Sequence, residues 1–241
     1  MLVAQTYRLW DDPNVVAHFQ SMDIPFHTQS VEIFLRLLPF ERNQPIRVLD
    51  LGCGGGSLLS TLLNIFPNAS GIGLDFSEPM LALARANLAV FGNRAGVVPA
   101  DFNNPEWTRP LDGSFDAIVS RYAIHHVPDD RKRGVYRESY ATLNPDGIFV
   151  NIEHVASLTP RGEALYDRLA VDTLYAGAMR RGEEPTYADV EAAFHRRPDK
   201  AANILTRTDV QLEWLRAAGF KDVDCYWKCF ELAILAGYKN S

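Results

Sequence analysis

The stretch that decides the fold is Val48-Leu49-Asp50-Leu51-Gly52-Cys53-Gly54-Gly55-Gly56-Ser57-Leu58. The first residues predict a buried apolar strand that ends in an acid, and a glycine-rich turn follows at once before a helix begins at Ser57. Glycine permits a sharp turn and lets a ligand approach the backbone closely. A turn of this kind between a strand and a helix N-terminus is typical of a nucleotide-binding site.

The spacing of the glycines indicates which nucleotide the turn would bind. A dinucleotide fingerprint, G-x-G-x-x-G, requires a third glycine at position 57, where this chain has Ser57. The pattern is instead D-x-G-x-G-x-G, and an acid before the glycines suits a ligand with an ammonium or a sulfonium better than a pyrophosphate. At these residues the sequence resembles the class I S-adenosylmethionine-dependent methyltransferases, whose first motif has this form. The resemblance implies S-adenosylmethionine as the cofactor, bound by Asp50, Gly52, Cys53, Gly54 and Gly56.

Three further strand ends fit the same family. Asp75 closes a second strand about 20 residues after the glycines, where an acid accepts hydrogen bonds from ribose hydroxyls, and Phe76 follows it. A third strand, 96–100, leads into Asp101 and Phe102, and the resemblance implies that these meet the adenine amino group and the base. Ser120 and Arg121, at the end of a fourth strand over 115–120, complete the expected cofactor set.

Strand and helix patterns alternate from about residue 46, which predicts an α/β fold with right-handed βαβ units. The last two strands, 222–227 and 231–239, are joined by too short a link for a parallel crossover and are expected to pair antiparallel. We therefore expect a Rossmann-like, seven-stranded methyltransferase sheet, six strands parallel and one antiparallel, with helices on both faces and a helical lid. The expected units are an N-terminal helical segment over the site (1–45), a cofactor-binding core (46–158), a helical insertion acting as substrate lid (159–208) and a C-terminal helix with a strand pair (209–241).

The acceptor is expected at the carboxyl ends of the strands, where ligands of open α/β sheets bind and where the N-terminal segment and the insertion can cover the site. An oxygen, thiol or carbon acceptor would need a base, whereas a neutral amine would not strictly need one. Histidine is the most adaptable base, although two adjacent histidines cannot both face the site from an extended turn. The base candidates are His125, His126 and His154, and the substrate candidates are Trp10, His27, Tyr122, Glu153, Tyr175 and Arg196. No complete set of metal ligands accompanies Glu153 and His154, so we expect no metal.

A narrower resemblance involves both ends of the chain. Segments 12–17, 217–220 and 227–230 are similar to the carboxy-S-adenosylmethionine synthases of tRNA wobble-uridine modification. In those enzymes an arginine of the insertion binds the extra carboxylate of the cofactor, and Arg196, or Arg197 after a one-residue slip, stands at that place here. The synthases continue Gly-Cys with Ser-Leu-Gly, which differs from this chain and favours plain methyl transfer.

The composition narrows the partners of this chain. Its 241 residues carry a net charge of −6, which argues against nucleic acid as the main partner and favours a small-molecule acceptor. The run Arg131-Lys132-Arg133 is expected to form a solvated helix face. No apolar leader or membrane-length stretch occurs, and the three cysteines match no disulfide framework, so a cytoplasmic protein is expected. A homodimer formed through the insertion stays open, as does a catalytically inert scaffold that binds S-adenosylmethionine.

Overall fold

The computed structural model describes residues 8–240, without the side chains of Arg8, His18 and Ser21. Its centre is a seven-stranded sheet in the order β3-β2-β1-β4-β5-β7-β6. Strand β7 pairs antiparallel with both β5 and β6, while the other pairs are parallel, which confirms the expected sheet. The strands are β1 (Arg47–Leu51), β2 (Ser70–Asp75), β3 (Ala95–Pro99), β4 (Phe115–Arg121), β5 (Leu143–His154), β6 (Lys221–Cys229) and β7 (Leu232–Tyr238).

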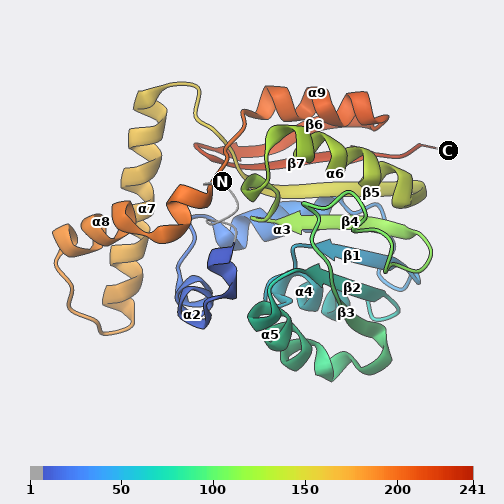
Figure 1. Cartoon of the computed structure of the whole chain (residues 1–241), viewed down its shortest axis with the longest axis horizontal. Helices are drawn as coiled ribbons and strands as arrows, with labels where there is room; N and C mark the ends of the chain where they lie inside the picture. The colour runs from blue at the N-terminus through green and yellow to red at the C-terminus, as the bar shows by residue number, and fades with distance from the viewer. Residues whose placement is uncertain (1–7, 241) are drawn as a thin grey trace.

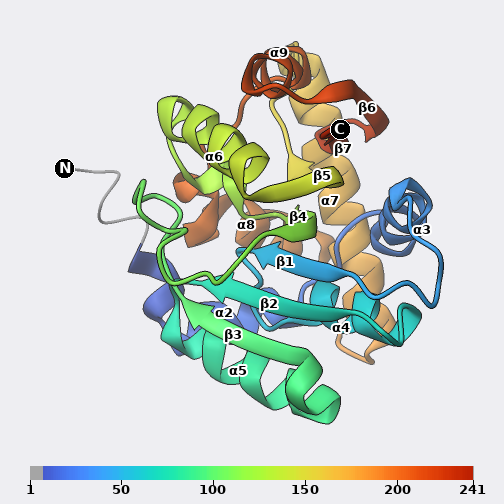
Figure 2. The same cartoon turned by 90° about the vertical axis from the view of Figure 1, so that its right-hand side faces the viewer.

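Helices cover both faces of the sheet, as Figures 1 and 2 show. Helices α3 (His27–Leu37), α4 (Ser57–Ile65) and α5 (Glu78–Leu88) contribute to the apolar cluster on one face, where Phe34 and Leu59 are fully buried. Helices α6 (Asp129–Thr142) and α9 (Thr208–Ala218) pack on the opposite face, where Tyr136 of α6 and Phe149 of β5 are fully buried. The remaining elements are α2 (Pro13–Ser21), α7 (Pro160–Arg180), α8 (Tyr187–Arg196) and the short 3-10 turns η1 (Arg8–Asp11), η2 (Ala89–Arg94), η3 (Ile124–His126) and η4 (Pro198–Ala202).

The insertion is helical, as the sequence predicts, and the structure describes no strand between β5 and β6. Helices α7 and α8 lie beyond the carboxyl ends of the parallel strands, and α2 lies beside them (Figure 1). The N-terminal segment is expected to cover the site, but its helix α3 packs Phe34 into the core beside the sheet. The division into an N-terminal cover, a core and a lid stays a prediction.

The strand order places the site. Strand β1 pairs with β2 on one side and β4 on the other, and the chain reverses its direction of winding between β1 and β4. Ligands of open α/β sheets bind at such a switch point, outside the carboxyl ends of the strands. Within residues 8–240, no helix has both the length and the apolar character that a membrane span requires.

Candidate functional site

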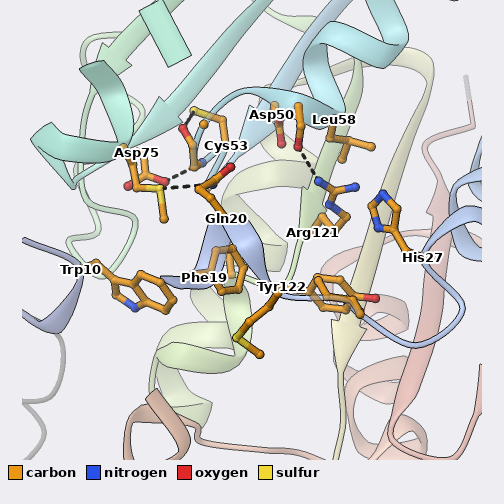
Figure 3. Close-up of a pocket in the computed structure, with 18 of the residues that line it drawn as sticks. Trp10, Phe19, Gln20, His27, Asp50, Cys53, Leu58, Asp75, Arg121 and Tyr122 are labelled. Atoms are coloured by element: carbon orange, nitrogen blue, oxygen red, sulfur yellow. Dashed lines mark hydrogen bonds between the residues drawn. The ribbon is translucent and has the colours of Figure 1, made fainter. Parts of the chain in front are cut away.

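A cavity of about 750 Å³ opens at the switch point. Its walls come from the glycine loop, the ends of β2 and β4, the residues after β3, the N-terminal segment and helix α7. Figure 3 shows Asp75 and Asp50 at the strand ends, with Trp10 and Phe19 facing them from the N-terminal segment. The predicted site residues that line the cavity are Trp10, His27, Asp50, Gly52, Cys53, Gly54, Asp75, Phe76, Phe102, Arg121, Tyr122 and His126.

The glycine loop forms a close-fitting floor. Gly52 and Gly54 have φ values of 73° and 51°, in the left-handed region that favours glycine. A Cβ at Gly52 would stand 2.3 Å from the Cβ of Ala123, so the backbone can occupy this place only without a side chain. The N–H groups of Gly52 and Cys53 both donate to the carbonyl of Leu74, which fixes the loop to the end of β2. The loop is therefore held against the sheet with its surface open to a ligand.

Asp75 joins the glycine loop to the next helix. One oxygen accepts the N–H of Gly54 at 2.9 Å, and the other accepts the N–H of Ser77 at 2.9 Å. Burial raises the pKa of Asp75, while these backbone donors act in the opposite direction. Because each carboxylate oxygen can accept more than one hydrogen bond, the group remains able to accept hydroxyl donors from the cavity.

Asp50 and Arg121 stand on the two strands of the switch point. Asp50 is buried and accepts the N–H of Leu59 at 3.2 Å, and burial raises its pKa to about 7 although the charge of Arg121 opposes the shift. The Arg121 guanidinium donates to the hydroxyl of Ser57 at 2.6 Å. Burial lowers the pKa of Arg121, and the charge of Asp50 offsets part of that effect. The cavity thus holds one acid and one guanidinium at the same end.

The residues after β3 give the cavity an aromatic wall. Phe102 is 4% exposed, and its carbonyl accepts the Arg131 Nε at 2.6 Å. Asp101 lies just outside the lining, where its carboxylate accepts the N–H of Asn103. The structure therefore brings Phe102, rather than the neighbouring acid, to the cavity wall.

The three base candidates differ in what their side chains contact. His125 is buried, with its Nδ1 2.6 Å from a carboxylate oxygen of Glu153, and His154 holds Glu231 through Nε2 at 2.9 Å. The turn at His125 and His126 is a 3-10 turn rather than an extended segment, and only His126 lines the cavity. Burial and the adjacent His125 lower the pKa of His126 to about 3, so this imidazole is neutral at physiological pH and a weak base.

Several other predicted residues lie away from the cavity. Glu153 is fully buried and also accepts the N–H of His154, so it holds the end of β5. Tyr175 packs edge-on against Tyr187 at the α7–α8 contact. Arg196 is exposed and its Nε bonds the carbonyl of Ala192 within its own helix. The remaining predicted residues outside the lining are Gly56, which caps α4, and Ser120, whose hydroxyl donates to the Leu51 carbonyl.

The sequence reasoning missed several cavity residues from outside the motifs. Asp23 and Arg180 face each other across the cavity edge, and Arg180 comes from α7, as does Thr173. Gln20, whose side chain approaches Gly55, and Met80 of α5 also line the cavity. None of these belongs to a recognisable motif, although helical spacing places Thr173 and Arg180 on one face of α7.

The expected solvated face at residues 131–133 is wrong for two of its three members. Lys132 is 1% exposed and donates to Asp129 and the Thr206 hydroxyl, while Arg131 holds the carbonyl of Phe102. These contacts tie α6 to the aromatic wall and to the end of the insertion. The run of charges could not reveal this, because Phe102 and Thr206 are distant in sequence from their partners.

The comparisons with known proteins agree with this geometry. A family model described as a methyltransferase domain matches residues 48–147. A carboxy-S-adenosyl-L-methionine synthase from Nautilia profundicola is 24% identical over 233 residues, 95% of this chain and 93% of that protein. A ubiquinone/menaquinone biosynthesis C-methyltransferase from Methylobacterium nodulans is 29% identical over 164 residues, 67% of this chain and 63% of that protein.

Solved methyltransferase structures share the fold. An O-methyltransferase family protein from Burkholderia thailandensis superposes with a TM-score of 0.63 at 16% identity, covering 89% of this chain. The structure described as PigF with SAH also gives 0.63, at 19% identity over 97% of this chain. This chain spans 56% and 62% of the lengths of those two proteins. The methyltransferase domain at its centre, the relatives and this sheet together support a class I S-adenosylmethionine-dependent methyltransferase with S-adenosylmethionine as its cofactor.

Proposed function

We propose that this methyltransferase acts on a small-molecule acceptor held between the N-terminal segment and helix α7. The observation that carries the proposal is the continuous cavity of about 750 Å³ that runs from the strand ends to Phe19, Phe26 and Thr173. Its volume lies in the range of small-ligand sites, and its lining mixes aromatic side chains with a few polar groups. A tRNA or DNA substrate would be expected to meet an open basic surface instead.

The residues present fit the cofactor. The side-chain-free floor at Gly52, the acid at Asp75 and the aromatic wall at Phe102 would hold the methionine backbone, the ribose and the base. When bound, S-adenosylmethionine supplies a methyl group on a sulfonium that is ready for in-line displacement. What the protein adds is orientation of the acceptor and exclusion of water, which lower the barrier without a further chemical group.

The weak basicity of His126 bears on the type of acceptor. Burial raises the pKa of the neighbouring Tyr122 to about 12, so this phenol keeps its proton at neutral pH and cannot serve as a base. Of the three predicted base candidates, only His126 lines the cavity, and its low pKa favours a nucleophile that needs little help in losing a proton. An amine, or an acceptor that is already ionised, meets this requirement.

Two experiments test the proposal. Titration calorimetry with S-adenosylmethionine, S-adenosylhomocysteine and NAD should show binding of the first two alone. Production of S-adenosylhomocysteine should then be measured with panels of small amines, phenols, thiols and activated carbon acids, and with bulk tRNA. Turnover with tRNA alone would contradict the small-molecule assignment, and cofactor binding with no turnover would point to an inert scaffold.

A carboxy-S-adenosylmethionine synthase-like activity is the second candidate, favoured by the similarity that extends over 95% of the chain. Arg196, which the resemblance assigns to the extra carboxylate, lies outside the cavity lining, and Arg197 stacks on Phe194 and pairs with Asp199. Mass spectrometry of the cofactor recovered from the purified protein distinguishes the candidates, because the synthase reaction leaves a carboxylated sulfonium.

A further inference from the structure

The end of the insertion holds the imidazole of His126 at the cavity wall. The Nδ1 of His126 lies 3.3 Å from the carbonyl oxygen of Ala202, the last residue of η4. The same segment is joined to the turn a second time, because the N–H of Ile204 donates to the carbonyl of His125 at 2.8 Å. These two neighbouring contacts fix the Ala202 carbonyl opposite the imidazole.

Two rings pack against the same imidazole. The ring centroid of Trp10 lies 5.4 Å from that of His126, and the ring centroid of His125 lies 4.0 Å from it. Trp10 is itself anchored, since its carbonyl accepts the Ser77 hydroxyl at 2.5 Å. The imidazole is thus confined by two rings and one carbonyl, which leaves it little room to turn.

The contact with Ala202 decides which nitrogen of His126 carries the proton. A carbonyl oxygen can only accept a hydrogen bond, so Nδ1 is the donor. Burial and the adjacent His125 lower the pKa of His126 to about 3, so the ring is neutral and Nε2 has an unprotonated lone pair. Within residues 8–240, Nε2 has no hydrogen-bond partner, and the residue lines the cavity. His126 therefore offers the cavity a neutral hydrogen-bond acceptor.

A lone pair in this place discriminates between the acceptors that a site with a weak base can serve. A phenolate or thiolate has no proton to donate to Nε2, and its negative charge would face the lone pair. An alcohol can donate its O–H but has to lose that proton during methyl transfer, and His126 is too weak a base to take it. An uncharged primary or secondary amine donates its N–H and keeps it during the transfer.

We propose that the Ala202 carbonyl holds His126 as the hydrogen-bond acceptor for the N–H of an uncharged primary or secondary amine, and so selects amines as methyl acceptors. The inference rests on the proposed function, a small-molecule acceptor in this cavity. In the transfer, the amine lone pair forms the new carbon–nitrogen bond, the carbon–sulfur bond breaks and the sulfur keeps its electron pair. The N–H proton stays on the nitrogen as it becomes positive, so its hydrogen bond to Nε2 strengthens in the transition state. Water takes this proton after the product leaves.

Nitrogen NMR reads the protonation of His126 without any acceptor. The protein is labelled with nitrogen-15 histidine and loaded with S-adenosylhomocysteine, and the His126 signals are assigned by their loss in His126→Gln. At neutral pH they should show a protonated Nδ1 and an unprotonated Nε2. A proton on Nε2, alone or together with one on Nδ1, would overturn the proposal.

Two anilines test the class of acceptor, because both are uncharged at neutral pH and only one has an N–H. N-methylaniline should shift the Nε2 signal of the loaded protein. It should also bind about 2- to 10-fold more tightly than N,N-dimethylaniline in calorimetry, the range for one neutral hydrogen bond. Equal affinities, or no binding of either aniline, would count against the assignment.

Two substitutions separate this role from a structural one. His126→Asn places an amide near the position of Nδ1, so it can still donate to Ala202 but leaves nothing at Nε2. It should keep the melting temperature and lose the preference for N-methylaniline. His126→Gln reaches the position of Nε2 with its amide, so it should keep part of the preference and lose stability with the contact to Ala202. His195→Asn, at an exposed histidine, is the control. A full preference in both His126 variants would leave His126 with a purely structural role.

Failure of this inference differs from failure of the proposed function. If the loaded protein produced S-adenosylhomocysteine with phenols or thiols and with no amine, the small-molecule assignment would stand and the selection of amines would be wrong. Turnover with tRNA alone would defeat the proposed function itself, and this inference with it.

Discussion

Gly52 and Ala123 face each other so closely that a Cβ on Gly52 would lie 2.3 Å from the Cβ of Ala123. The contact joins the turn after β1 to the turn after β4, across the switch point of the sheet. Neither neighbour can yield by a side-chain rotation, because the atom that would be struck is itself a Cβ. The floor of the cavity is therefore set by the absence of a side chain at one residue.

Gly52→Ala is expected to destabilise the protein by about 2–3 kcal/mol and to abolish measurable cofactor binding, since it adds this clash to a left-handed backbone. Chemical denaturation and calorimetry measure the two effects. Gly96→Ala is the matched control: Gly96 lies in edge strand β3, and a Cβ there would meet nothing within 4 Å. A Gly52→Ala protein that binds S-adenosylmethionine normally would contradict the assignment of the floor.

Asp75→Asn should weaken S-adenosylmethionine by about 10- to 100-fold, because the amide replaces one of two anionic acceptors facing the ribose. It should also lower the free energy of unfolding by about 1–2 kcal/mol, since Gly54 or Ser77 loses its acceptor. Asp116→Asn offers a matched control, because Asp116 accepts the backbone N–H of Arg47 outside the cavity. Loss of stability without any loss of affinity in Asp75→Asn would leave Asp75 with a purely structural role.

The raised pKa of Asp50 leads us to expect that cofactor binding depends on pH. Its pKa of about 7 means that the carboxyl is largely protonated at pH 6 and largely ionised at pH 8 in the free protein. A cationic ligand favours the ionised form, so binding at pH 6 must expel a proton, and affinity should be about tenfold weaker at pH 6 than at pH 8. Calorimetry at both pH values measures this ratio.

Asp50→Asn is the control for that titration, because its amide oxygen can still accept the N–H of Leu59. The variant should bind more weakly at pH 8 and show little change between pH 6 and 8. A wild-type affinity that is equal at both pH values would mean that the cofactor cations do not sense Asp50.

The strand-end acids and glycines were accessible to sequence reasoning because they are local. Asp50, Gly52 and Asp75 occupy fixed distances from a turn that interrupts an apolar strand, and the structure brings all three to one cavity. The order and direction of the strands followed in the same way from alternation and from the short final link. The hydrophobic periodicity of the sequence and the spacing of its acids and glycines therefore predict most of the fold and the cofactor-binding part of the site.

The acceptor side depends on contacts that no local pattern records. Glu153 is the last residue but one of β5, yet its side chain is buried in the core, where His125 and the N–H of His154 meet its charge. Arg196 shares a helix with residues that face α7, but its own side chain points to solvent. Arg180 reaches the cavity because α7 is long enough to place its last turn next to Asp23. Each of these outcomes is set by packing between distant segments.

Asp23 and Gly177 give the last prediction, which concerns how the cavity is closed. Asp23, in the loop before α3, pairs with Arg181 at 2.7 Å and lies so close to α7 that a Cβ on Gly177 would stand 1.7 Å from its carboxylate. Both partners are partly exposed, so the ion pair itself is worth only about 0–1 kcal/mol. Asp23→Ala should therefore change the melting temperature little, while it speeds release of S-adenosylhomocysteine in a stopped-flow displacement assay.

Gly177→Ala separates packing from helix propensity. Alanine in a helix interior normally stabilises by about 1 kcal/mol over glycine, so a gain is expected wherever nothing opposes the methyl group. Here the methyl would displace Asp23, and Gly177→Ala alone should lower stability and speed ligand release. In the Asp23→Ala background the carboxylate is gone, the remaining close atom is the mobile end of the Arg181 side chain at 3.2 Å, and the same substitution should raise stability. If Gly177→Ala raised stability in both backgrounds, the loop at Asp23 would move aside at no energetic cost. Asp23 would then not hold the N-terminal segment against α7.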